Sequence, residues 1–184
     1  MKAGTRALGI ADSSGESIGT FAGCVVRADR VCDGVAFSSF TVGGTDATDA
    51  VLDIVRVLDR EDIQYLLLAG IAPGWFNLVD LRRIHRETSL PTLSISFEGS
   101  NGLSPAITDS FEGNNMQERL ETYESLPERR RLVVGSNALF VRSVGLSVER
   151  VETVVRAFTP EGGRPEPLRV ARIAARAGQE YRYR

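Results

Sequence analysis

Carboxylate side chains follow predicted strands at positions where they could bind a divalent cation. Asp12 lies just past the apolar segment 6–10, and Asp46 follows a glycine-rich turn at Gly43 and Gly44. Paired carboxylates can hold Mg²⁺ or Mn²⁺ and activate water for phosphodiester cleavage. Asp12 and Asp46 are therefore the candidate catalytic and metal-ligating residues. Simpler roles stay open for both: Asp12 as a turn carboxylate that caps local amides, and Asp46 as a helix N-cap.

The loop after the predicted strand 64–68 carries aromatic side chains. Trp75 and Phe76 could stack on a nucleobase, and the Asn77 amide could hydrogen-bond to the edge of that base. Alternatively, Phe76 packs in the core and Asn77 is another helix N-cap. Asp80 falls in the first helical turn, where a negative charge is favourable without any ligand.

The glycine-rich turn before Asp46 could present backbone N–H groups to an anion. It is not a P-loop, because it lacks the lysine and the spacing of that motif. Together with the aromatic loop and the basic C-terminal segment, this turn supplies the candidate ligand-binding residues. These are Thr45, Thr48, Trp75, Phe76, Asn77, Asp80, Arg164 and Arg169.

The C-terminal segment is locally basic, although the whole chain has a net charge of −2. Three of its arginines recur at helical spacing on one face of a predicted helix. That face comprises Arg169, Arg172 and Arg176, and Val170, Ile173 and Ala177 lie opposite. The stripe could contact phosphates, or it could be an ordinary solvated face.

The chain lacks the residues for other common catalytic mechanisms and for a zinc site. His85, the only histidine, falls inside a predicted helix among arginines, which argues against a Ser-His-Asp or Cys-His mechanism. Cys24 and Cys32 cannot complete a four-ligand zinc site with one histidine. Reduced structural thiols are favoured over a disulfide across the predicted hairpin.

Length and composition are those of one globular domain. The chain has 184 residues, of which 42% are hydrophobic and 25% charged. We expect a single domain over residues 1–184, with residues 159–184 forming a basic loop and helix packed on it. No apolar run is long enough for a membrane span, and the N-terminus lacks a signal peptide. We therefore expect a cytoplasmic protein without a membrane partner.

The order of apolar segments predicts a mixed α/β fold. Strands are predicted at 6–10, 20–27, 32–42, 64–68, 92–97, 132–134 and 138–141. Helices are predicted from 46 to 58 and at 77–87, 104–111, 116–126, 147–158 and 168–177. Three antiparallel strands followed by alternating helices and parallel strands is the order of a ribonuclease-H-like fold. A flavodoxin-like sheet would need helices after the first two strands, where there is no room for them.

Four motifs resemble a known archaeal family, domain of unknown function 99. They are GIADSS, VGGTDATDAV, LLLAGIAPGWFNLVDL and GRPEPLRVARIAA, in the family's order and spacing over nearly the whole chain. The family is similar to endonuclease V, and some members are called endonuclease dU. The resemblance implies a ribonuclease-H-like fold, DNA cleavage near deaminated bases, and Mg²⁺ or Mn²⁺ as cofactor.

The chain departs from the family where the metal should bind. The resemblance implies aspartates at three positions where this chain has Ala11, Gly43 and Ala69. The leading hypothesis is therefore an endonuclease-V-like protein with a degenerate metal site and no resident cation. It would bind nucleic acid, DNA in preference to RNA, or a nucleotide-like ligand through a crevice formed by Asp12, Asp46 and the aromatic loop and flanked by the C-terminal arginines. One alternative is an active Mg²⁺- or Mn²⁺-dependent endonuclease with rearranged ligands, and another is a non-catalytic module for protein assembly.

Overall fold

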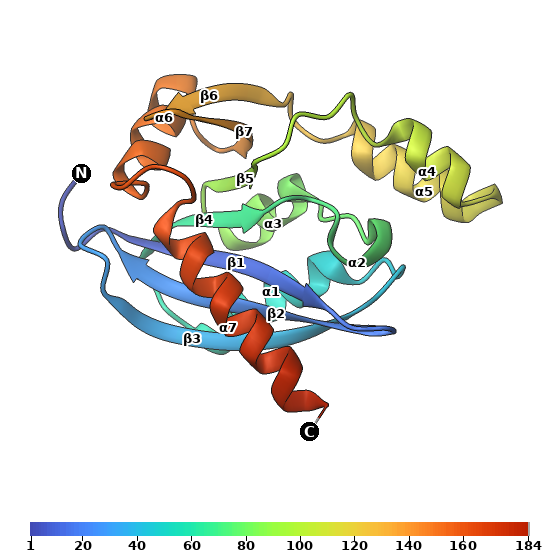
Figure 1. Ribbon diagram of the computed structural model, residues 1–184, viewed down its shortest axis with the longest axis horizontal. Coiled ribbons are helices and arrows are strands. Elements are labelled where there is room, and N and C mark those ends of the chain that lie inside the picture. The colour runs from blue at the N-terminus through green and yellow to red at the C-terminus, as the bar shows by residue number, and fades with distance from the viewer. Residues whose placement is uncertain (184) are drawn as a thin grey trace.

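One mixed seven-stranded sheet organises the computed structural model, which describes residues 1–183 (Figure 1). The strand order is β3-β2-β1-β4-β5-β7-β6. The strands are β1 (Arg6–Ser14), β2 (Ile18–Arg27), β3 (Cys32–Thr41), β4 (Ile63–Ala69), β5 (Thr92–Ser96), β6 (Arg130–Val134) and β7 (Asn137–Val144). The helices are α1 (Ala47–Leu58), α2 (Pro73–Phe76), α3 (Leu81–Thr88), α4 (Ser104–Ser110), α5 (Gly113–Glu124), α6 (Val148–Ala157) and α7 (Glu166–Arg182).

The pairing of the strands confirms the predicted fold class. Strand β2 pairs antiparallel with both β1 and β3, whereas β4 pairs parallel with both β1 and β5. Strands β7 and β6 continue the sheet in antiparallel pairing. The C-terminal ends of the parallel strands therefore meet at one edge, where ligands bind in open α/β sheets.

Helices cover both faces of the sheet. Helices α1 and α3 lie behind the sheet in Figure 1, and α7 crosses its front. Alternate β1 residues serve the two faces: Leu8 and Ile10 join the core under α1 and α3, whereas Ala7 packs in the core that includes Leu168 of α7. This period of two is the one that a strand buried on both sides requires.

Helix α7 lies very close to β1, and Gly9 makes that approach possible. A Cβ atom at Gly9 would overlap the Pro167 backbone at the start of α7. The helix buries Leu168, Ala171 and Ala175 against the sheet. Two of the sequence motifs, GIADSS and GRPEPLRV, are thereby in direct contact.

The buried face of α7 differs from the predicted one. Its core-facing side includes Gln179, which accepts a hydrogen bond from Thr20, whereas Ile173 is 59% exposed. The solvent face therefore contains an apolar residue as well as arginines. The helix also begins earlier and ends later than the predicted 168–177. It spans Glu166–Arg182, and Pro165 occupies the N-cap position.

The second predicted helix, 77–87, is also corrected. A short helix α2 precedes Asn77, and α3 begins at Leu81 with Asp80 as its N-cap. The Asp80 side chain accepts hydrogen bonds from the backbone N–H groups of Arg82 and Arg83. Asp80, rather than Asn77, therefore satisfies the free amides of this helix. Among residues 1–183, no helix is both long enough and apolar enough to cross a membrane.

Helices α4 and α5 form a pair that projects to one side of the sheet (Figure 1). The pair follows the parallel strands in the chain and lies beside the loops at their C-terminal ends. Arg119 of α5 reaches those loops, as described below. The projecting pair therefore borders the edge of the sheet at which the parallel strands end.

Candidate functional site

Two of the positions expected to carry metal-binding acids lie under α7. Ala11 of β1 is 1% exposed and packs with Cys24, Val26 and Ala171. Ala69, the last residue of β4, is partly buried against the same cluster. The strand ends thus converge as the resemblance implies, but they present methyl groups to one another and to the helix.

Asp12 is the acid nearest to this cluster in the sequence. It is partly buried near the end of β1, where it pairs in register with Phe21 of β2. Burial raises the pKa of the Asp12 carboxyl above its usual value, and the nearby charge of Arg172 offsets this only in part. A partly desolvated carboxylate beside a cation is a common feature of functional sites.

Asp46 is held within the protein by three donors. Its carboxylate accepts hydrogen bonds from the Thr41 N–H at 3.0 Å, from the Thr41 hydroxyl at 2.8 Å and from the Asn77 amide at 2.6 Å. Burial acts to raise the pKa of Asp46, but these hydrogen bonds outweigh it, and the pKa lies below its usual value. Asp46 sits at the N-cap position of α1, yet its side chain does not cap that helix.

Asn77 supplies the missing cap. Its Oδ1 accepts a hydrogen bond from the Ala47 N–H at 2.9 Å, and its Nδ2 also donates to the Thr41 carbonyl oxygen. Asn77 is fully buried. Since both ends of its amide bind within the fold, Asn77 joins β3, α1 and the α2 loop and does not present an edge to a nucleobase.

Arg119 of α5 connects the glycine-rich turn to the aromatic loop. Its guanidinium donates to the carbonyl oxygens of Gly43 at 2.6 Å, Gly44 at 2.9 Å and Phe76 at 3.1 Å. The side chain is 2% exposed and stacks over the Phe111 ring at 4.0 Å. The third position expected to carry a metal-binding acid is therefore Gly43, and its carbonyl oxygen accepts a hydrogen bond from the buried Arg119 guanidinium.

The aromatic loop adopts a strained backbone conformation. Gly74, Trp75 and Phe76 have φ angles of 46°, 62° and 56°. The left-handed region is unfavourable for bulky residues, so the surrounding structure must hold the loop. The Gly43 N–H donates to the Gly74 carbonyl oxygen at 2.6 Å, and Phe76 stacks edge-on against Phe111. Trp75 is 61% exposed.

The remaining candidates of this region line a small polar cavity. Thr45, Thr48 and Asp80 border a cavity of about 190 Å³ together with Arg83 and Glu118, among others. The Thr48 hydroxyl accepts a hydrogen bond from the Asp80 N–H at 3.0 Å. Thr48 and Asp80 thus connect α1 to the start of α3, and Thr45 is exposed.

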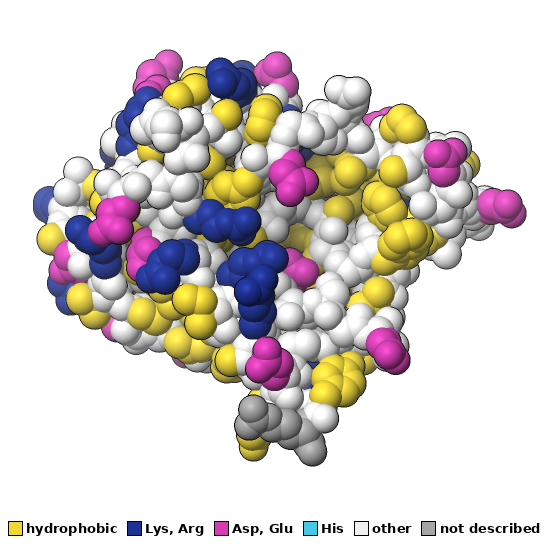
Figure 2. All heavy atoms as spheres, viewed as in Figure 1, with side chains coloured by type: hydrophobic (Ala, Val, Ile, Leu, Met, Phe, Trp, Pro, Cys, Tyr) yellow, Lys and Arg dark blue, Asp and Glu magenta, His cyan; other side chains and the backbone are white. Residues whose placement is uncertain are grey.

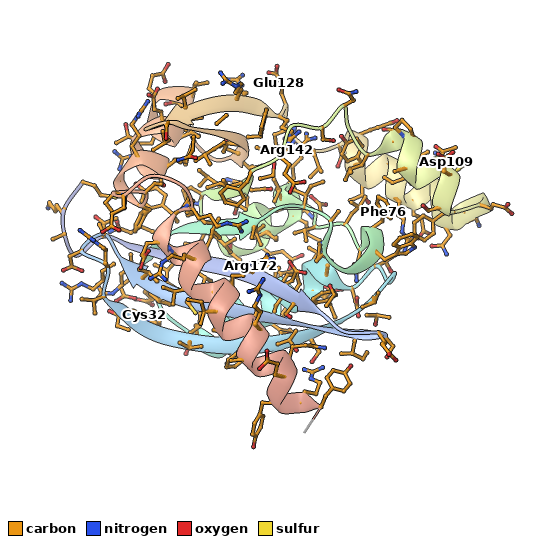
Figure 3. The ribbon with its side chains drawn as sticks, viewed as in Figure 1. Cys32, Phe76, Asp109, Glu128, Arg142 and Arg172 are labelled. Atoms are coloured by element: carbon orange, nitrogen blue, oxygen red, sulfur yellow. The ribbon has the colours of Figure 1, made fainter. Side chains whose placement is uncertain are left out.

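The candidate arginines lie on and before α7. Arg164 stacks over Phe97, whereas Arg169 forms an ion pair with Glu166 at 2.6 Å. Within residues 1–183, no ion pair is formed by Arg164, Arg172 or Arg176. Figure 2 shows dark-blue side chains gathered over α7 beside a hollow in the surface, and Figure 3 places Arg172 on α7 where the helix crosses β1.

These donors do not fit a two-metal site. Such a site needs several carboxylates around cations about 4 Å apart. Within residues 1–183, no three His, Cys, Asp or Glu side chains gather closely enough to hold a metal ion. Asp46 is occupied by Thr41 and Asn77, and Asp12 lies within the field of Arg172, which disfavours a cation.

The residues set aside on sequence grounds have structural positions. His85 Nδ1 lies 2.8 Å from the Leu90 carbonyl oxygen, where it fixes the end of α3. Both cysteines are free; Cys24 is buried and Cys32 is exposed. Burial and the neighbouring Cys32 raise the pKa of the Cys24 thiol to about 12, which makes Cys24 a poor nucleophile at neutral pH.

We expect Asp12→Asn to raise the melting temperature at pH 7. The folded state raises the Asp12 pKa, so this group favours folding at low pH and loses that contribution as the pH rises through the folded pKa. The neutral asparagine avoids the cost of the buried charge. The gain should shrink from pH 7 toward pH 4 in thermal melts. The exposed Asp109→Asn variant should show no such trend, and a pH-independent gain for Asp12→Asn would contradict the assignment.

Comparison with known proteins assigns the chain to a family. The family model for endonuclease dU matches residues 3–178. The chain belongs to the endonuclease dU family. A UPF0215 protein of Thermococcus gammatolerans is 34% identical over 157 residues, which make up 84% of this chain and 78% of the relative. A UPF0215 protein of Archaeoglobus fulgidus is 31% identical over 94% of this chain and 92% of its own length.

Solved structures show how the family fold relates to endonuclease V. A protein of unknown function from Archaeoglobus fulgidus has a TM-score of 0.83 at 30% identity, covering 94% of this chain and 96% of that one. Human endonuclease V has a TM-score of 0.65 at 16% identity, covering 98% and 86%. Ciona intestinalis endonuclease V, solved with DNA containing an inosine followed by a ribo-adenosine, has a TM-score of 0.65 at 10% identity, covering 96% and 87%. The endonuclease dU family therefore shares the endonuclease V fold.

Sequence reasoning missed the residue that joins the site loops. Arg119 lies in a polar helix without a motif, and nothing in its spacing indicates burial. Arg142 of β7 also has no motif around it, and it lines a cavity beside the end of β5. Both arginines act through contacts between distant segments, which a sequence pattern does not display.

Proposed function

We propose that this member of the endonuclease dU family binds nucleic acid, with DNA preferred over RNA, and has lost the metal site needed for hydrolysis. The observation that carries the proposal is the packing of Ala11 and Ala69 against one small cluster under α7. These two positions lie on neighbouring strands of the nuclease fold, and neither has a carboxylate. Asp12 and Asp46 remain candidates for ligand contact.

Unneutralised arginines support binding to a polyanion. Arg164, Arg172 and Arg176 form no ion pair within the described chain, so their charge is available to phosphates, although Arg172 also acts on the nearby Asp12 carboxylate. They lie on or just before α7, which covers the strand ends. Since the net charge is −2, the attraction is local, and we expect binding to be weak and strongly dependent on salt.

The aromatic loop supports contact with unpaired bases. Trp75 is exposed on a backbone that the Gly43 and Phe111 contacts hold in place. Stacking of a base on an aromatic side chain is worth about 1–3 kcal/mol and tolerates any sequence. The complex of Ciona intestinalis endonuclease V with DNA gives a precedent for DNA binding on the same fold.

Fluorescence anisotropy with labelled single-stranded DNA, duplex DNA and RNA tests this proposal. We expect affinity to fall steeply with salt, and Arg172→Ala with Arg176→Ala to reduce the slope against log salt by about 1 for each lost phosphate contact. Trp75→Ala should weaken single-strand binding by roughly tenfold. No binding to any of these probes at low salt would overturn the proposal.

A matched control and a cleavage assay complete the test. The Arg56→Ala, Arg86→Ala variant removes the same charge from α1 and α3, on the other face of the sheet, and should retain the salt slope. Wild-type protein should leave uracil- and inosine-containing DNA uncut in Mg²⁺ or Mn²⁺. Metal-dependent cleavage that is lost in Asp12→Ala would instead support the active enzyme with rearranged ligands.

A further inference from the structure

A second cavity lies at the C-terminal ends of β4 and β5. It has a volume of about 370 Å³, which is within the range of small-molecule sites. Its lining includes Gly70 and Ile71, which follow β4, and Ser94 and Ser96 of β5. Two arginines, Arg129 before β6 and Arg142 on β7, also line it, as do Tyr123, Phe140 and Glu98.

The two guanidinium groups are held in fixed orientations. Arg129 stacks over the Phe140 ring at 4.3 Å and donates to the Ser96 hydroxyl at 2.8 Å. Arg142 lies over the Tyr123 ring at 5.3 Å and donates to the Pro127 carbonyl oxygen. Figure 3 shows Arg142 on β7, near the connection between β5 and α4. Such support lowers the entropy lost when a guanidinium binds a ligand.

The charges of these arginines are not balanced by ion pairs. Within residues 1–183, neither Arg129 nor Arg142 pairs with a carboxylate, and Glu98 contributes its backbone carbonyl oxygen rather than its charge to Arg129. Burial, together with the neighbouring Arg142, lowers the pKa of Arg129. Two cations that repel each other in a partly desolvated cavity favour an anion between them.

We propose that this cavity binds the phosphate monoester group of a nucleotide through Arg129 and Arg142. Each guanidinium keeps N–H groups beyond those used by the contacts above, and Arg is suited to bidentate binding of phosphate oxygens. Ser94 lines the same space. The cavity exceeds the size of a phosphate alone and leaves room for a sugar or a base. This site is separate from the α7 surface of the proposed function. The two proposals can be tested independently, because a free nucleotide suffices as the ligand of the cavity.

Isothermal titration calorimetry in low-salt buffer free of phosphate and sulfate tests the site. We expect thymidine 5′-monophosphate and inorganic phosphate to bind and thymidine not to bind. Arg142→Gln should weaken the nucleotide about tenfold or more. Arg131→Gln is the matched control, because Arg131 is an exposed neighbour on β6 whose loss changes the charge equally.

Two further arms separate the source of the phosphate and exclude misfolding. A 5′-phosphorylated oligonucleotide that binds more tightly than its 5′-hydroxyl form identifies a strand end, and equal binding identifies a free nucleotide. Arg142→Lys, which keeps the charge, should recover part of the affinity, and melting curves check that each variant is folded. The proposal fails if thymidine binds as well as its monophosphate. It also fails if folded Arg142→Gln retains wild-type affinity, or if Arg131→Gln loses as much.

Discussion

Arg119→Met is expected to lower the free energy of unfolding by about 2–4 kcal/mol and the melting temperature by roughly 10 °C. The methionine keeps most of the buried volume but removes the donors to Gly43, Gly44 and Phe76. Three partly buried carbonyl groups then lose their partner, and only the packing of Phe76 against Phe111 is left among the contacts described above between the α4–α5 pair and the site loops. Chemical denaturation and thermal melts measure the effect.

Two variants separate this connection from general damage to α5. Glu124→Ala alters an exposed residue of the same helix and should leave stability within about 0.5 kcal/mol of the wild type. Arg119→Lys keeps the charge but loses the planar set of donors, so its free energy of unfolding should lie between those of the wild type and Arg119→Met. Limited proteolysis should cut the loop around Trp75 faster in Arg119→Met. If Arg119→Met is as stable as the wild type and is cut by the protease at the same rate, the site loops keep their conformation without this arginine.

The fold could be predicted from the sequence because its central strands are buried on both sides. The segment Leu66–Leu68 reads as an uninterrupted apolar run, and each of these side chains is at most 2% exposed. The glycine-rich turn before α1 and the proline before β5 mark the ends of elements by local chemistry. The helix boundaries were less accurate where a cap could be chosen from several polar residues, as between Asn77 and Asp80.

The sequence predicts which residues lie in the candidate site, but it does not predict which hydrogen bonds they form. Asp46 was expected to cap α1, but its carboxylate binds Thr41 while Asn77 caps that helix. Asp46 directly precedes α1, whereas Asn77 follows α2 at a distant point of the chain, so local preference favours Asp46 as the cap. The choice is made by the packing of β3, α1 and the α2 loop, which lie far apart in the chain. The burial of Arg119 is likewise determined by contacts between segments that are distant in the chain.

Ala11→Asp combined with Ala69→Asp is expected to destabilise the metal-free protein strongly and to create a response to Mn²⁺. A carboxylate at position 11 would be buried beside Cys24, Val26 and Ala171. An unpaired buried charge costs about 3–5 kcal/mol, and a second carboxylate nearby adds repulsion. A cation that binds only the folded state stabilises it in proportion to the logarithm of its concentration. Mn²⁺ should therefore raise the melting temperature of the double variant and leave the wild type unchanged.

The double variant Ala11→Asn, Ala69→Asn is the control, because it adds side chains of nearly the same size without charge. It should be destabilised by crowding and should not respond to Mn²⁺. A wild-type protein that Mn²⁺ stabilises would mean that Asp12, Asp46 or other present carboxylates bind the cation, and the proposed loss of the metal site would be wrong. A double aspartate variant that folds without any response would mean that positions 11 and 69 do not converge on one cation. The proposal requires that Mn²⁺ leave the wild type unchanged and that it stabilise the double aspartate variant. If a metal site was lost at these positions, acids restored there should bind metal again.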